Sequence, residues 1–139
     1  MILVIRISGM VDVPRTIENG LYRIRLRRKY VAVILENNAN NLKLLKKLRN
    51  YVAYGDVSKE VLEKIVLMRG KTLKKNFKIE PKKIIDDIEK KGLLKSGLKP
   101  YFRLHPPRGG IESKKHAGVG KGVLGDNKEK INELVLRML

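Results

Sequence analysis

Apolar and polar residues follow one another along the first half of the chain in short blocks that predict strands and helices in turn. The runs 2–7, 30–35 and 51–55 are mostly apolar and predict buried strands. Between them, apolar residues recur every three or four positions, which predicts amphipathic helices from about 15 to 25 and from about 40 onward. The order is strand, helix, strand, helix, strand. The pattern leaves open whether these strands pair in parallel, as strands joined by helices usually do.

Residues at the expected helix ends sharpen these boundaries. Pro14 is suited to the first position of the first helix, and an asparagine at 40 or 41 is suited to cap the second. Ser58 is placed to cap a third helix, which Gly70 can end. The faces expected to be buried are Ile17, Leu21 and Ile24 in the first helix, Leu44, Leu45 and Leu48 in the second, and Val61, Leu62, Ile65 and Met68 in the third.

The composition of the chain changes after Gly70. Residues 71–78 hold four lysines and no acid, and are interpreted as a linker or an arm against RNA. Two helices are expected beyond them: 81–91, with Ile84, Ile85 and Ile88 inside, and a closing helix with Ile131, Leu134, Val135 and Met138 inside, preceded by a capping box of Asp126 and Glu129. We therefore expect one compact unit, with an α+β core over 1–70 and a basic extension over 71–139 that packs on it.

The charge of the chain indicates its partner. Thirty-two Lys and Arg against fourteen Asp and Glu leave a net charge of +18, which favours a polyanion. Nucleic acid is favoured over an anionic membrane, because no apolar run approaches the ~18 residues of a spanning helix. Without cysteine and with only two histidines, we expect no disulfide, no metal site and no cofactor. The start of the chain does not resemble a signal peptide, so a cytoplasmic location is expected.

The basic residues cluster in two segments. The first, 23–29, has five bases in seven residues and no acid; cations at the carbonyl end of a helix dipole would explain one or two of them. The second, 99–125, has six Lys or Arg against Glu112 alone, and two adjacent prolines and two glycines predict a stiff bend there. The alternative is a solvated basic loop, with histidines bonded to local backbone. The residues expected to contact RNA are Arg23, Arg25, Arg27, Arg28, Lys29, Arg103, His105, Arg108, Lys114, Lys115, His116 and Lys121.

Two segments could be interpreted as catalytic, but neither has the residues that catalysis would need. The segment 118–122 is rich in glycine with one lysine, but it lacks the spacing and the hydroxyl residue of a phosphate-binding loop. The carboxylates Asp86, Asp87 and Glu89 lie on a lysine-rich helix with no catalytic partner nearby. The chain is therefore not expected to be an enzyme.

Several motifs together resemble the archaeal and eukaryotic form of large-subunit ribosomal protein thirty, whose eukaryotic counterpart is called protein seven. The resemblance covers nearly the whole chain. The segments that carry it are 13–17 (VPRTI), 24–28 (IRLRR), 51–55 (YVAYG), 104–110 (LHPPRGG), Lys115-His116, 125–127 (GDN) and Ile131-Asn132. The bend at 104–110 is the most specific of them.

The resemblance implies a structural protein of the large ribosomal subunit, with ribosomal RNA and neighbouring ribosomal proteins as partners. It implies a ferredoxin-like α+β core with an antiparallel three-stranded sheet and helices on one face, extended by short helices and basic loops. The length beyond Gly70 and the absence of a long basic amino-terminal arm point to an archaeal protein. The alternatives are a free RNA-binding regulator or RNA-folding chaperone and, less favoured, an RNA-modifying or hydrolytic enzyme.

Overall fold

A computed structural model of the chain describes residues 1–76 and 78–139. The described residues form five α-helices, two short 3-10 helices and six strands, and this α+β content confirms the predicted class. The strands are β1 (Ile2–Arg6), β2 (Val31–Leu35), β3 (Val52–Asp56), β4 (Phe102–Arg103), β5 (Ser113–His116) and β6 (Gly122–Asp126). The helices are α1 (Arg15–Arg23), α2 (Ala39–Leu48), α3 (Lys59–Arg69), α4 (Pro81–Lys91), η1 (Leu93–Lys95), η2 (Lys128–Lys130) and α5 (Ile131–Met138).

The sheet is built around β1, which pairs antiparallel with β2 and with β3. Loops 7–14 and 24–30, on either side of α1, let the chain enter β2 from the end at which it left β1. The pairing that the hydrophobic pattern left open is therefore antiparallel, as the family resemblance implied.

The sheet has six strands in the order β4-β2-β1-β3-β6-β5, so the expected three-stranded sheet was too small. Strand β4 pairs antiparallel with β2, and β6 runs parallel to β3. These added strands carry weak sequence signals, because β4 has two residues and β6 holds two glycines in five positions. Residues from after Gly70 thus extend both edges of the core sheet.

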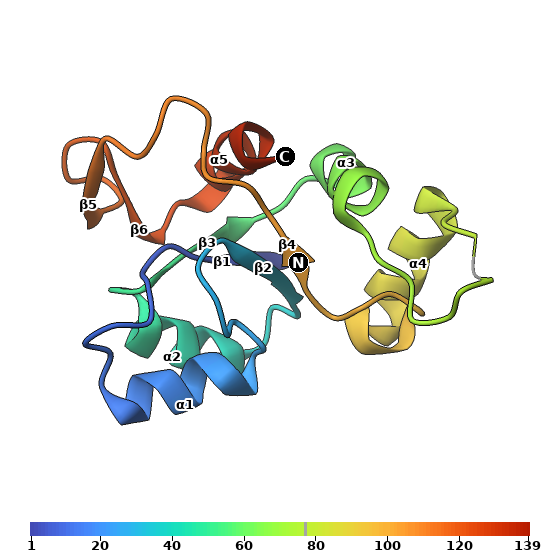
Figure 1. Ribbon diagram of the computed structural model, residues 1–139, viewed down its shortest axis with the longest axis horizontal. Helices are drawn as coiled ribbons and strands as arrows, with labels where there is room; N and C mark the ends of the chain where they lie inside the picture. The colour runs from blue at the N-terminus through green and yellow to red at the C-terminus, as the bar shows by residue number, and fades with distance from the viewer. Residues whose placement is uncertain (77) are drawn as a thin grey trace.

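The helices lie on both sides of the sheet (Figure 1). Helices α1 and α2 lie together below it, and α3 and α5 lie above, with α4 beside α3. Gly20 lets α1 approach α2 closely, since a Cβ there would be 3.3 Å from Leu48 Cδ2. Leu21, Leu45 and Leu48 are buried as predicted, as are the three isoleucines of α4 and the four predicted core residues of α5.

Met68 was wrongly placed in the core, since its side chain is 59% exposed. Val66 is fully buried, and the residue that continues its face is Arg69, three positions later. Arg69 reaches the end of the chain, where its Nη2 donates to the Leu139 carbonyl oxygen at 3.0 Å. The buried face of α3 therefore ends on a long cation that binds the residue after α5, and Met68 turns outward.

The predicted helix caps were correct in part. Ser58 Oγ accepts a hydrogen bond from Val61 N, as expected. Pro14 is the residue before α1, which starts at Arg15, and is not its first helical residue as predicted. The predicted cap at Asn40 or Asn41 was wrong, because both lie inside α2, which starts at Ala39 with Asn38 before it. The capping box at 126–129 does not form: Asp126 Oδ1 accepts from Lys128 N at 2.9 Å, and η2 separates β6 from α5.

The segment 71–78 was expected to be a linker or an arm; position 77 lies outside the described residues. Its first residues pair with the segment that follows η1. Thr72 forms a bridge with Leu98, Leu73 N donates to Gly97 O, and Lys99 N donates to Lys71 O at 2.7 Å. Within the ranges described above, no helix is long and apolar enough to cross a membrane.

Candidate nucleic-acid interface

The first basic segment is shaped by the way in which α1 ends. Leu26 N donates to Leu21 O at 2.9 Å and Arg25 N donates to Tyr22 O at 3.0 Å. These are the two hydrogen bonds of a Schellman cap. Its two apolar partners, Leu21 and Leu26, are fully buried. The cap requires one residue in the left-handed conformation, usually a glycine. Here Arg25 adopts this conformation, with a φ of 66°. The predicted helix end at residue 25 was therefore two residues too long.

The loop after this cap is anchored by Arg6, a residue that sequence reasoning missed. Arg6 is buried at the end of β1, and its guanidinium donates to three carbonyl oxygens: Leu26 at 2.8 Å, Gly9 at 2.8 Å and Ser8 at 3.1 Å. Its own carbonyl accepts from Tyr30 N at 2.7 Å. Burial lowers the pKa of Arg6, yet arginine stays protonated at neutral pH. The only sequence signal was a cation closing an apolar strand.

Strand β4 brings the second basic segment to the first. Arg103 pairs with Val31, and Leu104 N donates to Tyr30 O at 3.0 Å. Residues that lie about seventy positions apart in the sequence thus become neighbours at one edge of the sheet.

Between the first basic segment and the β4 region lies a hollow of about 580 Å³. We call it the arginine hollow; its lining residues are Tyr22, Arg23, Arg25, Arg27, Arg28, Val31, Tyr101 and Arg103. None of these carries a negative charge. Arg27 lies 5.9 Å from the centre of the Tyr22 ring and Arg103 lies 6.0 Å from that of Tyr101. A concave surface with five guanidinium groups and two aromatic rings is suited to phosphates and bases.

Sequence reasoning did not select the two tyrosines. Each lies within two positions of an arginine that was selected, Tyr22 before Arg23 and Tyr101 before Arg103. Aromatic residues next to cations were the signal that could have found them.

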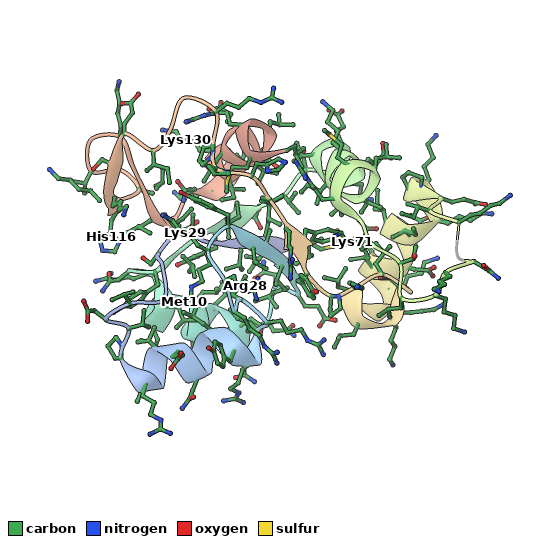
Figure 2. All side chains as sticks on the ribbon, in the orientation of Figure 1. Met10, Arg28, Lys29, Lys71, His116 and Lys130 are labelled. Atoms are coloured by element: carbon green, nitrogen blue, oxygen red, sulfur yellow. The ribbon has the colours of Figure 1, made fainter. Side chains whose placement is uncertain are left out.

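Lys29 belongs to the same loop but does not line the arginine hollow. Its Nζ lies 4.9 Å from the centre of the Tyr30 ring. Figure 2 labels Arg28 and Lys29, which come from the loop between α1 and β2.

The bend at 104–110 is present as predicted and is held by the closing helix. Gly109 and Gly110 have φ of 79° and 73°, and Gly110 N donates to Pro107 O at 3.0 Å. Arg137 Nε donates to the Arg108 carbonyl oxygen at 3.0 Å, and Arg137 Nη2 donates to that of Gly110.

The main chain fixes this bend further. Arg108 N donates to Arg137 O and His105 N donates to Met138 O, both at 2.9 Å. The side chains of His105 and Arg108 are exposed, and neither lines the arginine hollow.

The remaining predicted residues lie at the other edge of the sheet. Lys114, Lys115 and His116 are on β5, the strand farthest from β4, and Figure 2 shows His116 on that side. Lys121 follows in the next turn, where its Nζ lies 2.8 Å from Glu112 Oε2. The hydrogen bond and the charge of Glu112 raise the pKa of Lys121.

The structure therefore gathers Arg23, Arg25, Arg27, Arg28 and Arg103 in one place and leaves the other seven predicted residues outside it. Over the part of the chain that is described, no three His, Cys, Asp or Glu side chains gather as a metal site would need.

Comparison with known proteins gives the family. No family model matches the chain. A large ribosomal subunit protein uL30 of Aeropyrum pernix is 36% identical over an alignment of 154 positions, gaps included, which covers 98% of this chain and 97% of that protein. The uL30 proteins of Archaeoglobus fulgidus and Desulfurococcus amylolyticus are 34% and 38% identical, with 99% and 98% of this chain and 99% and 96% of those proteins covered. The chain belongs to the archaeal-type family of large ribosomal subunit protein uL30.

Proposed function

We propose that this chain is a structural constituent of the large ribosomal subunit and binds ribosomal RNA, chiefly through the arginine hollow. The observation that carries the proposal is the meeting of five arginines and two tyrosines at the β2–β4 edge, with no carboxylate among the residues that line the hollow. The relatives are named as large ribosomal subunit proteins, and the family is non-enzymatic.

The hollow supplies most of the attraction in this proposal. An arginine side chain forms two parallel hydrogen bonds with phosphate oxygens. Together, the five arginines of the hollow neutralise several phosphates of one RNA segment. Because affinity for RNA begins with phosphate neutralisation, this site orients the protein before any finer contact forms.

The other two basic regions contribute further contacts. His105 and Arg108 project from a bend whose backbone is already fixed, so RNA would meet them without ordering the loop. Lys114, Lys115, His116 and Lys121 lie across the sheet, and Lys121 must exchange Glu112 for a phosphate. An exposed ion pair is weak, so this exchange costs little.

The same proposal extends to the architecture. The β1-α1-β2-α2-β3 unit serves as a ferredoxin-like core, and residues 71–139 act with it as one unit, since Tyr101 and Arg103 complete the arginine hollow. Neighbouring ribosomal proteins are expected to contact the remaining faces.

The test is the salt dependence of binding to large-subunit ribosomal RNA. If about 6 to 10 phosphates are contacted, the affinity falls by about three to five orders of magnitude between 50 and 200 mM salt. Replacing Arg27 and Arg28 by alanine reduces the slope by roughly two, while the control substitution of Lys90 and Lys91 on α4 leaves it close to that of the wild type.

A slope near zero contradicts the proposal. Co-sedimentation with large subunits after a high-salt wash then separates a constituent, which stays bound, from a free regulator or chaperone, which washes off.

A further inference from the structure

We propose that the arginine hollow holds a single unpaired nucleotide of the RNA, with its base against a tyrosine ring and its phosphates against the surrounding arginines. This inference rests on the proposed function, because it names the element of RNA structure that the same site takes.

The size of the hollow favours a nucleotide over a duplex. About 580 Å³ lies within the range of pockets that enclose small ligands, roughly 300 to 1,000 Å³. An A-form helix is far wider than such a pocket and would touch only its rim. An unstacked nucleotide can enter it.

The chemistry of the lining points the same way. Duplex RNA offers phosphates and hydroxyls at its surface but keeps its base faces stacked on one another, so these faces cannot stack on an aromatic ring of the protein. Tyr22 is 42% exposed, and Tyr101 is half-buried with its ring toward Arg103. An unpaired base can stack on such rings and on the guanidinium planes beside them.

The site is also formed in advance. Arg25 is set by the Schellman cap, Leu26 is fixed by the Arg6 guanidinium, and Arg103 is held by its pairing with Val31. Because the backbone that carries these arginines is already fixed, binding a nucleotide orders only their side chains, and the cost in conformational entropy is smaller than for a loop that must also fold.

The experiment uses the full chain and three RNA hairpins that differ at one position. The first hairpin has one bulged adenosine, the second has an abasic sugar at the bulge, and the third is fully paired. Binding is measured by fluorescence anisotropy at one fixed salt concentration. The bulged adenosine is expected to bind about five- to a hundredfold more tightly than the abasic bulge, as a stacked base requires. With 2-aminopurine at the bulge, binding is expected to quench its fluorescence.

Variants assign this preference to the hollow. The double substitution Tyr22→Ala and Tyr101→Leu is expected to bring the ratio of the two affinities close to one, whereas Tyr22→Phe with Tyr101→Phe keeps it. Leu94→Ala, an exposed apolar change on η1, is the matched control and also keeps the preference. Should the Ala/Leu variant not fold, the abasic comparison and the quenching in the wild type decide alone.

Two results would overturn the inference. One is equal affinity of the wild type for the adenosine and abasic bulges, and the other is a preference that survives in the folded Ala/Leu variant. If the salt slope stays steep in these cases, only this inference is lost. If the slope is flat as well, the proposed function is lost with it.

Discussion

Arg6 Nη1 donates a hydrogen bond to the Leu26 carbonyl oxygen at 2.8 Å, and through it a buried cation at the end of the central strand fixes the basic loop. The loop contacts Arg6 a second time, since Tyr30 N donates to the Arg6 carbonyl oxygen. The position of the arginine hollow is therefore coupled to the core of the protein. Arg6 itself is buried and does not line the hollow, so its effect on RNA acts through the loop.

Replacement of Arg6 by methionine tests this coupling. The change leaves the carbonyl oxygens of Leu26, Gly9 and Ser8 without their donor, so we expect a loss of about 2 kcal/mol or more in the free energy of unfolding. RNA affinity should fall as well, although Arg6 does not reach the RNA.

Urea unfolding and RNA binding measured on the same preparation check this result. The matched control is Arg23→Met, which removes a cation of the hollow itself. It should weaken RNA binding and leave the free energy of unfolding within about 0.5 kcal/mol of the wild type. Unchanged stability of Arg6→Met would contradict an anchoring role.

Arg25 occupies a position where glycine is the usual residue, so its charge is kept at a conformational cost. Substitution by glycine removes the strain of the left-handed conformation, and we expect a gain of about 0.5 to 1 kcal/mol in the free energy of unfolding. RNA affinity should fall, and the salt slope should decrease by about 0.9 because one phosphate contact is lost.

Alanine at the same position separates the two effects. Arg25→Ala keeps a Cβ in the left-handed conformation but removes the charge, so it should lose RNA affinity as the glycine variant does, without the gain in stability. Thermal unfolding and a salt titration of both variants measure this. Equal stability of the glycine and alanine variants would show that the strain is not relieved.

Much of the core could be predicted from the sequence because its signals are local. The apolar runs at 2–7 and 30–35 became β1 and β2, and isoleucines at helical spacing became the buried face of α4. Such patterns depend only on residues that lie a few positions apart. Hydrophobic periodicity is therefore sufficient to locate them.

The site could be predicted only in part because its parts come from distant segments. The first basic segment and Arg103 were both selected, but only the pairing of Val31 with Arg103 shows that they meet. Strand β4 has two residues and no recognisable pattern. Met68 was misplaced for a related reason, since the end of the buried face of α3 is set by Leu139 at the far end of the chain.

Gly55 lies where the closing segment crosses β3, and this explains why the third strand carries a glycine near its end. A Cβ at this position would clash with the Lys128 carbonyl oxygen and lie 3.1 Å from Ile131 Cβ. Gly55→Ala should therefore displace the start of α5 and lower the free energy of unfolding by about 2 kcal/mol or more.

Thermal unfolding measures this effect, with Gly9→Ala as the control. No heavy atom would lie within 4 Å of a Cβ at Gly9, so that variant should unfold within a few degrees of the wild type. A Gly55→Ala protein with wild-type stability would mean that the contact between β3 and η2 is loose.

Arg108 and Arg137 are two arginines at the same bend with opposite roles. Arg108 takes part through its main chain, whose N–H and carbonyl bond to Arg137, while its side chain is exposed. Arg108→Ala should therefore weaken incorporation into the large subunit and change the free energy of unfolding by less than about 0.5 kcal/mol.

Arg137 does the reverse, because its side chain donates to the carbonyl oxygens of Arg108 and Gly110. Arg137→Ala should loosen the bend and cost about 1 to 2 kcal/mol in the free energy of unfolding. Reconstitution of large subunits with each variant, alongside urea unfolding, measures both effects. If Arg108→Ala destabilises the isolated protein as much as Arg137→Ala does, Arg108 is a structural residue, and the bend presents no free cation to RNA.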